Sequence, residues 1–248
     1  MSDFDRGLAR PAPTTVDMAM DAGLRSFMLG VYNKVAMGLV LSAALAFVTG
    51  TVPSVSQLLW RTDELGRRGY TLLGMVITFA PIGIILFRNF VRNQSPRMAG
   101  IIYWSIVSLI GASLGTVFMF YQNMAIFQTF LVTAAAFGGL SLVGYTTKRD
   151  LTGMGSFLVM GLIGLIVAMF AGLFFHSPAL MFAINVIGVL IFAGFIAYHT
   201  QALKGTYYQL GGNAAAMSVA TNYGALSLYL DFINLFSFLL NLMGGGRR

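Results

Sequence analysis

The sequence predicts an all-α membrane protein with seven transmembrane helices, and three observations lead to this fold class. Of the 248 residues, 57% are apolar and only 9% are charged, whereas about a quarter are charged in a soluble globular protein. Apolar runs of about 20 residues recur along the chain, and a helix of that length crosses a hydrocarbon core about 30 Å thick. So few charged side chains cannot cover the surface of a soluble domain, which excludes that class.

The apolar runs are expected to form one transmembrane domain, residues 26–248, behind a polar N-terminal segment. That segment, residues 1–25, contains two prolines and is expected to be a disordered cytoplasmic tail. Most connections are short, but residues 200–222 contain three glycines and are expected to form an irregular loop. The expected spans, in order, are residues 27–48, 70–87, 100–121, 124–145, 155–175, 178–199 and 223–243.

The distribution of Lys and Arg predicts a cytoplasmic N-terminus. With seven spans, nine Lys and Arg residues lie in the expected cytoplasmic segments and five in the outer ones, as the positive-inside rule requires. A re-entrant last segment would move Arg247 and Arg248 inside and enlarge the asymmetry, but its 21 residues suffice for crossing. The net charge of +7 is therefore explained by membrane topology, and no nucleic-acid partner is expected.

Small residues recur inside the expected spans at spacings that permit close helix packing. Glycine pairs of this kind lower the distance of closest approach between membrane helices. They are Gly111 and Gly115, Gly138 and Gly139, and Gly161 and Gly164. Such pairs are common in membrane proteins and indicate no particular function.

Catalytic and cofactor motifs are missing from the sequence. The chain has no cysteine and only two histidines, His176 and His199, which excludes disulfides, thiolate chemistry and iron–sulfur ligation. It contains no H-E-x-x-H, G-x-S-x-G or P-loop motif. We therefore expect neither an enzyme nor a bound cofactor, and the lipid bilayer is the one certain partner.

Asp231 is the only acidic residue within an apolar run. On a helix, Ser227, Asp231, Asn234 and Asn241 fall within about 80° of arc, so this polar stripe should face the bundle interior. A carboxylate in a membrane is costly unless it is paired, protonated or hydrated. Two interpretations stay open: an ion- or proton-linked site, or a buried pair that only joins helices.

Two other polar residues end their expected spans on the cytoplasmic side. His199 ends the sixth span, and Asn185 lies 14 residues earlier, about 40° away on the same helix face. Arg88 ends the second span, where it is expected to anchor the helix at the interface. In the turn between the fourth and fifth spans, Asp150 or Thr152 can cap the following helix.

Three segments resemble the Bax-inhibitor (transmembrane Bax-inhibitor-motif) family, in a form that suggests a bacterial member. Residues 225–236, which read ALSLYLDFINLF, are similar to the last-helix signature of that family. Residues 144–150, which read GYTTKRD and are followed by Ser156-Phe-Leu, resemble its junction between the fourth and fifth helices. Val31-Tyr32 resembles the start of its first helix, so the resemblance covers roughly residues 25–243.

The resemblance implies a seven-helix bundle whose last helix is central and is wrapped by helices 1–3 and 4–6. It further implies a pH-sensitive calcium leak protein of the cell inner membrane. The family's ion site pairs an Asp at the end of helix six with an Asp in helix seven, bridged by an Arg from helix two. Asp231 matches the helix-seven acid, Arg88 matches the bridging Arg by position, and His199 replaces the helix-six acid.

This replacement changes the expected chemistry of the pair. Two adjacent carboxylates form a proton sensor and offer hard oxygen ligands to calcium, whereas an imidazole suits softer metals. Asp231 is left as a weak calcium ligand, and His199 as an altered pH sensor. The first functional hypothesis is a calcium leak channel with this altered pair. The alternative is a non-conducting regulator of a membrane-anchored AAA protease or another membrane partner.

Overall fold

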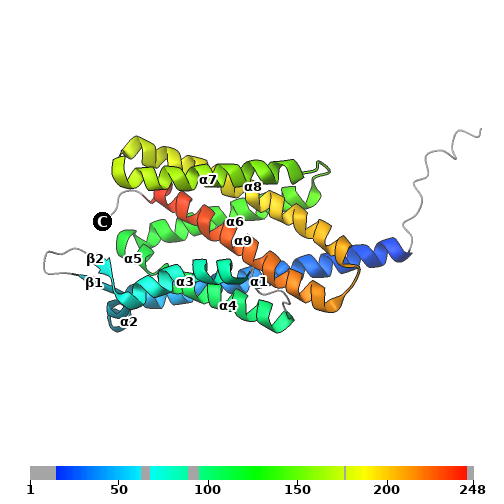
Figure 1. Cartoon of the computed structure of the whole chain (residues 1–248), viewed down its shortest axis with the longest axis horizontal. Helices are drawn as coiled ribbons and strands as arrows, with labels where there is room; N and C mark the ends of the chain where they lie inside the picture. The colour runs from blue at the N-terminus through cyan, green and yellow to red at the C-terminus, as the bar shows by residue number, and fades with distance from the viewer. Residues whose placement is uncertain (1–14, 63–67, 89–94, 176, 245–248) are drawn as a thin grey trace, which may run out of the picture.

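The computed structural model describes residues 15–62, 68–88, 95–175 and 177–244, and this part of the chain is helical apart from one short hairpin. Figure 1 shows two groups of helices, with the last helix, α9, running obliquely between them. The elements are α1 (Thr15–Thr51), α2 (Pro53–Leu59), β1 (Trp60–Thr62), β2 (Arg68–Tyr70), α3 (Leu72–Arg88), α4 (Pro96–Ser113), α5 (Thr116–Phe120), α6 (Asn123–Thr146), α7 (Thr152–Phe175), α8 (Pro178–Leu210) and α9 (Ala214–Met243).

Six segments of the described chain are long and apolar enough to cross a bilayer, so the protein is a multi-pass membrane protein. They are Ala22–Thr51, Pro96–Phe120, Asn123–Thr146, Thr152–Phe175, Pro178–Leu210 and Ala214–Met243. The second expected span corresponds to α3, whose apolar part, Leu72–Leu86, is shorter than these six.

The first helix begins earlier than the sequence analysis predicts. α1 starts at Thr15, so residues 15–25, which were expected to belong to a disordered tail, are helical. The prolines of the N-terminal segment lie before this point, and the Met and Ala residues after it favour a helix. Residues 1–14 of the expected tail lie outside the described residues.

The expected loop at residues 200–222 is wrong. α8 continues to Leu210 and α9 begins at Ala214, which leaves three residues between the helices. Gly211, at φ 55°, ends α8 in the left-handed conformation that glycine adopts easily. The Asn213 side chain then accepts a hydrogen bond from the Ala216 N–H and caps α9. Gly205 lies inside α8, since a single glycine costs a helix only about 1 kcal/mol.

The connection before α3 is structured, which the sequence analysis did not predict. Pro53 occupies the first turn of α2, where its missing N–H costs nothing. β1 and β2 then pair antiparallel, with Trp60 opposite Tyr70. The third expected span also differs, because it is interrupted at Leu114 and Gly115 into α4 and α5.

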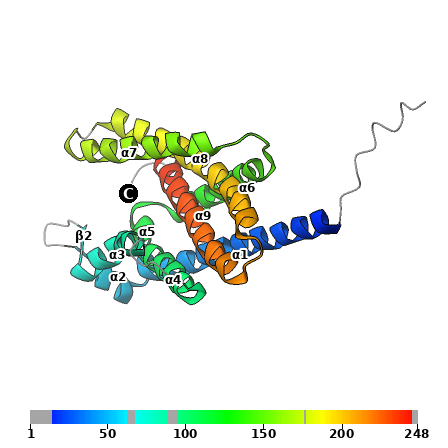
Figure 2. The ribbon, with the colours of Figure 1, turned by 45° about the vertical axis from the view of Figure 1, so that its right-hand side comes forward.

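α9 packs against α8, α1, α6 and α4, between the two groups of helices that Figure 2 shows from a second direction. Half of its most apolar window (50%) is buried, more than in any of the other five candidate spans. One face meets α8, where Phe238 packs on Gly188. The other face meets α1 and α6, through Tyr229 beside Ser42 and through Phe232 beside Phe130.

Close backbone contacts at glycine fix several of these helix pairs. A methyl carbon added to Gly111 would lie 2.6 Å from Cα of Ser42, so α4 and α1 approach through this glycine. A methyl carbon added to Gly115 would clash with Oγ1 of Thr49 and lie 2.9 Å from the backbone nitrogen of Gly50. The expectation for Gly138, Gly139 and Gly164 is wrong, because a methyl carbon there would meet nothing within 4 Å. Spacing alone does not separate the packed glycines from those that face open space.

We expect Gly144→Ala to destabilise the protein by about 1–3 kcal/mol, as overpacking of a tight interior does. The added methyl carbon would lie 2.9 Å from Cα of Ala197, so α6 and α8 would have to separate. Gly138→Ala on the same helix is the matched control and should leave stability unchanged or slightly higher. Thermal unfolding in detergent measures both variants, and equal midpoints would contradict the packing described here.

Candidate functional site

The one ion pair within the described residues joins His199 of α8 to Asp231 of α9. Nδ1 of His199 lies 2.6 Å from Oδ2 of Asp231. The Asp231 side chain is 5% exposed and the His199 side chain 29% exposed, so the carboxylate is buried while the imidazole reaches the edge of the bundle. The structure therefore brings together the two residues that the sequence analysis placed in one site.

The seam between α8 and α9 holds the pair in position on both sides. Gly224 of α9 receives Leu203 of α8 on one side, and Gly188 of α8 receives Phe238 of α9 on the other. The His199 ring also stacks on Phe195, one turn earlier, with ring centres 5.3 Å apart and planes 11° from parallel. Stacking holds the plane of the imidazole, and in the structure Nδ1 of that ring faces the carboxylate.

The other polar residues that were predicted to line a pore or a packing face do not converge on Asp231. Asn185 donates to the Met181 carbonyl and Asn234 to the Leu230 carbonyl, each within its own helix. Asn241 accepts a hydrogen bond of 2.6 Å from the hydroxyl of Tyr121, and Ser227 is half-buried. None of these hydrogen bonds involves Asp231, and the part that these side chains play in a pore or polar packing face remains a prediction.

The predicted role of Arg88 also remains a prediction. Its backbone forms the last residue of α3, and its side chain lies outside the described residues, as does His176. Within the described residues no three His, Cys, Asp or Glu side chains lie close enough together to hold a metal ion. A calcium ion at the pair would therefore find one carboxylate and one imidazole, a poor match to its preference for six to eight oxygen ligands.

A second polar cluster, which the sequence analysis did not identify, lies on the opposite face of α9. The hydroxyl of Tyr229 lies 2.7 Å from Oγ of Ser42, which in turn donates to the Val107 carbonyl. The hydroxyl of Tyr103 donates to the Lys34 carbonyl at 2.6 Å. Tyr229 precedes Asp231 by two residues, so the sequence signature contained it, but nothing in the sequence marked Ser42 as its partner.

The turn between α6 and α7 is tied to α8 by Gln201. Its side-chain oxygen accepts from the Leu151 N–H at 2.8 Å, and its side-chain nitrogen donates to the Arg149 carbonyl at 2.8 Å. As predicted, Asp150 caps this turn, because its Oδ1 accepts from the hydroxyl and the N–H of Thr152. The hydrogen bond from the Thr152 hydroxyl lowers the pKa of the Asp150 carboxyl most, and the bond from the Thr152 N–H lowers it further.

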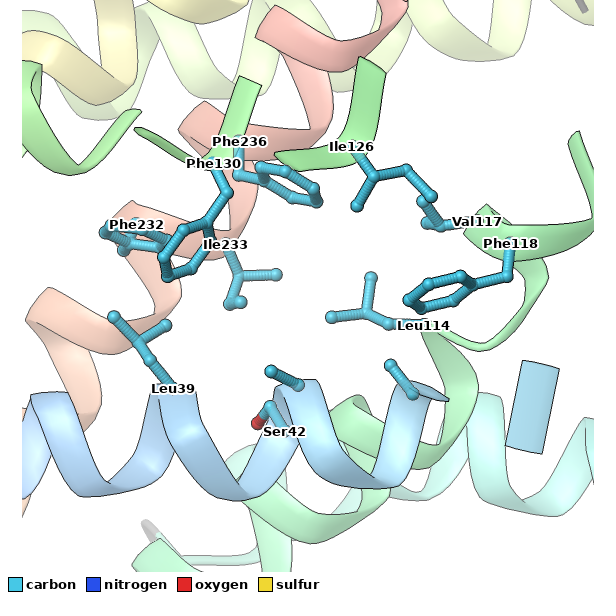
Figure 3. A pocket seen from close by; sticks show the side chains of 12 residues that line it. Leu39, Ser42, Leu114, Val117, Phe118, Ile126, Phe130, Phe232, Ile233 and Phe236 are labelled. Carbon is cyan, nitrogen blue, oxygen red and sulfur yellow. The ribbon is translucent and has the colours of Figure 1, made fainter. Parts of the chain in front are cut away.

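An apolar cavity of about 90 Å³ lies beside α9. Residues of α1, α5 and α6 and Leu114, which follows α4, also line it. Figure 3 shows the rings of Phe130, Phe232 and Phe236 on one side of it and Leu39 and Ser42 of α1 on the other. A cavity of this kind stays dry, because a trapped water needs two or more polar partners.

Comparisons with known proteins agree with the resemblance seen in the sequence. The family model described as "Inhibitor of apoptosis-promoting Bax1" matches residues 24–248. An uncharacterized protein of Caulobacter vibrioides is 61% identical over 249 residues, with all of both chains covered. The "Inner membrane protein YbhL" of Escherichia coli is 37% identical over 91% of this chain and 94% of its own length.

We expect His199→Ala to destabilise the protein strongly, because removing one partner of a buried pair costs roughly 3–5 kcal/mol and leaves a carboxylate alone. Adding Asp231→Asn should recover part of this loss, since an amide is cheaper to bury than a lone carboxylate. Thermal unfolding of the two single variants and the double variant forms a double-mutant cycle. Additive effects would contradict a direct interaction between the two side chains.

Proposed function

Because the chain belongs to the Bax inhibitor family of membrane proteins, we propose that it is a pH-sensitive cation leak channel of the inner membrane. Calcium is the proposed ion, either transported or sensed. The observation that supports this proposal is the 2.6 Å contact between His199 and the buried carboxylate of Asp231. Ionisable side chains are rare inside membranes, and those that occur usually mark ion or proton pathways.

In this proposal the contact represents the closed state. While the imidazole neutralises Asp231, a cation gains little from approaching the carboxylate, and the close-packed seam leaves it no space. Release of Asp231 exposes a negative charge inside the bundle, which attracts a cation strongly at low dielectric constant. The Tyr229 and Tyr103 hydroxyls bond to Ser42 and to the Lys34 carbonyl, and the Lys34 ammonium lies 5.8 Å from the centre of the Tyr103 ring, so these groups are engaged in the second polar cluster.

The dry cavity supports a second barrier in series with the pair. It lies next to Phe232, the residue that follows Asp231 on α9, and its lining is apolar apart from Ser42. Apolar constrictions exclude ions because water does not wet them. We infer that conduction requires the groups around Phe130 and Phe236 to move apart as well as the pair to open.

The membrane topology is part of the proposal. We infer that α3 crosses the bilayer as a seventh span, since its 17 residues are at the lower limit for a transmembrane helix. The N-terminus is then cytoplasmic, by the excess of Lys and Arg on that side. α9 becomes the central helix, wrapped by helices on both sides, as the family resemblance implies.

The alternative function is a non-conducting regulator that binds a membrane-anchored protease or another membrane protein. One observation favours it. α1 begins at Thr15, seven residues before its apolar segment at Ala22, and so presents a helical extension where a partner could bind. This alternative requires no ion flux, which separates it from the channel hypothesis.

We expect calcium flux into proteoliposomes that contain the protein, and we expect Asp231→Asn to change both its rate and its pH profile. Both side chains of the contact are ionisable, so removal of one of them should change how flux depends on pH. A fluorescent calcium indicator inside the vesicles, read from about pH 5 to about pH 8, measures this profile over the range in which histidine side chains change charge.

Asp17→Asn is the matched control, because it neutralises a carboxylate on the N-terminal extension of α1, outside the candidate membrane spans. Its flux and pH profile should equal those of the unmodified protein. An Asp231→Asn profile identical to the unmodified one would refute the role of Asp231. Absence of flux from every variant would instead favour the non-conducting regulator.

We expect His199→Asp to raise the sensitivity of the protein to calcium by about tenfold or more, because ligand charge tunes calcium affinity over several orders of magnitude. Two carboxylates would then share the position of the present pair, and repulsion between them would favour binding of a proton or a divalent cation. His199→Asn, which adds an oxygen without a charge, is the control. Isothermal titration with calcium measures the effect, and equal affinities in the two variants would contradict the site.

A further inference from the structure

A crevice of about 530 Å³ opens between α1 and α6, at the end of the bundle where α1 begins its apolar segment. It is lined almost entirely by apolar side chains, and its volume is typical of a pocket for a small ligand. Leu29 on one rim is 51% exposed and Leu142 on the other 63% exposed. Both helices are candidate membrane spans, so these rims face the hydrocarbon and the crevice opens sideways into the bilayer.

The crevice runs along the two helices for about 12 Å, the rise of the eight residues from Phe137 to Tyr145. At its deep end the rings of Tyr32 and Phe137 meet edge to face, with centres 6.5 Å apart. An elongated apolar group fits this shape, whereas a compact polar ligand would leave most of the lining unused.

Positive charge lies at the mouth of the crevice. Arg25 is three residues from the start of the apolar segment of α1, and its side chain is exposed. It makes no ion pair with Asp150 or Asp231, the two acids whose side chains the structure describes. Lys204 adds a second positive charge near the same end, where its Nζ donates to the carbonyl of Tyr145, a lining residue.

A buried hydroxyl inside the crevice has no partner. Ser141 is 5% exposed, and its Oγ makes no hydrogen bond within the described chain. Thr133 and Thr146 of the same helix each donate to the carbonyl four residues earlier, so the geometry for such a bond is available on α6. Ser141 lies one turn deeper than Tyr145, about 6 Å from the mouth along the helix.

We propose that this crevice binds one anionic glycerophospholipid from the adjacent leaflet. The acyl chain lies along the apolar lining toward Phe137, and the phosphate contacts Arg25. The hydroxyl of Ser141 donates to an ester carbonyl of the glycerol backbone, which satisfies the buried oxygen. A cation at the interface, an apolar channel below it and one hydroxyl between them match the order of groups in such a lipid.

Binding of phosphatidylglycerol and phosphatidylcholine to the detergent-solubilised full chain, followed by native mass spectrometry, tests the proposal. The unmodified protein should retain one phosphatidylglycerol and prefer it over phosphatidylcholine. Arg25→Gln should weaken phosphatidylglycerol binding by roughly fivefold, equivalent to about 1 kcal/mol for one interfacial charge. Arg97→Gln, at an exposed position at the start of α4, is the charge control and should bind as the unmodified protein does.

Gly138→Phe should fill the crevice, because this glycine lines it and a Cβ added there would meet no described atom within 4 Å. It should abolish phosphatidylglycerol retention. Gly139→Phe is the matched control, since this glycine also meets nothing within 4 Å but is not part of the lining.

Three results would overturn the proposal. Equal retention of both lipids would show that no anionic headgroup is recognised. Unchanged retention in Gly138→Phe would place the lipid elsewhere on the surface. A dimer of the unmodified protein that dissociates in Gly138→Phe would assign the crevice to a second copy of the chain.

Discussion

A carboxylate buried inside a membrane bundle must have a partner, and the arrangement of α8 and α9 follows from this constraint. The Asp231 side chain is only 5% exposed, and among the described residues its ion-pair partner is the imidazole of His199. The partner can reach it only if α8 and α9 lie in close antiparallel contact. Small residues on both helices permit that contact, and the stacked Phe195 keeps the imidazole aligned.

α9 therefore carries two different kinds of contact surface. Toward α8 it presents the ionisable group, within a seam that glycines bring together. Toward α1 and α6 it presents rings, a hydroxyl pair and a dry cavity. Tyr229 and Asp231 are two positions apart on α9 and point to opposite sides of it, Tyr229 toward α1 and Asp231 toward α8. A change in the rotation of α9 would disturb both faces at once, which couples the charged contact to the apolar one.

Composition and apolar runs predicted the membrane class and most of the helices, because span length is imposed by the bilayer rather than by partners. The same reasoning failed at residues 200–222, where glycines were taken as breakers although only Gly211 adopts a positive φ that ends a helix there. For the site, the signature around Asp231 and the position of His199 predicted their contact. Ser42 and Gln201 could not be predicted, since they bind groups far away in sequence and nothing local distinguishes them.

Two apolar side chains, one on either side of the ion pair, restrict how α8 and α9 can move. Leu203 packs against Gly224, and Phe238 packs against Gly188. These two contacts prevent α8 and α9 from sliding along their axes. A shift of one helix by one turn along the other is therefore blocked. Rotation of the His199 ring and sideways separation of the helices are not. The two helices can therefore separate sideways but cannot slide, and the resistance to sliding comes from two uncharged side chains, Leu203 and Phe238.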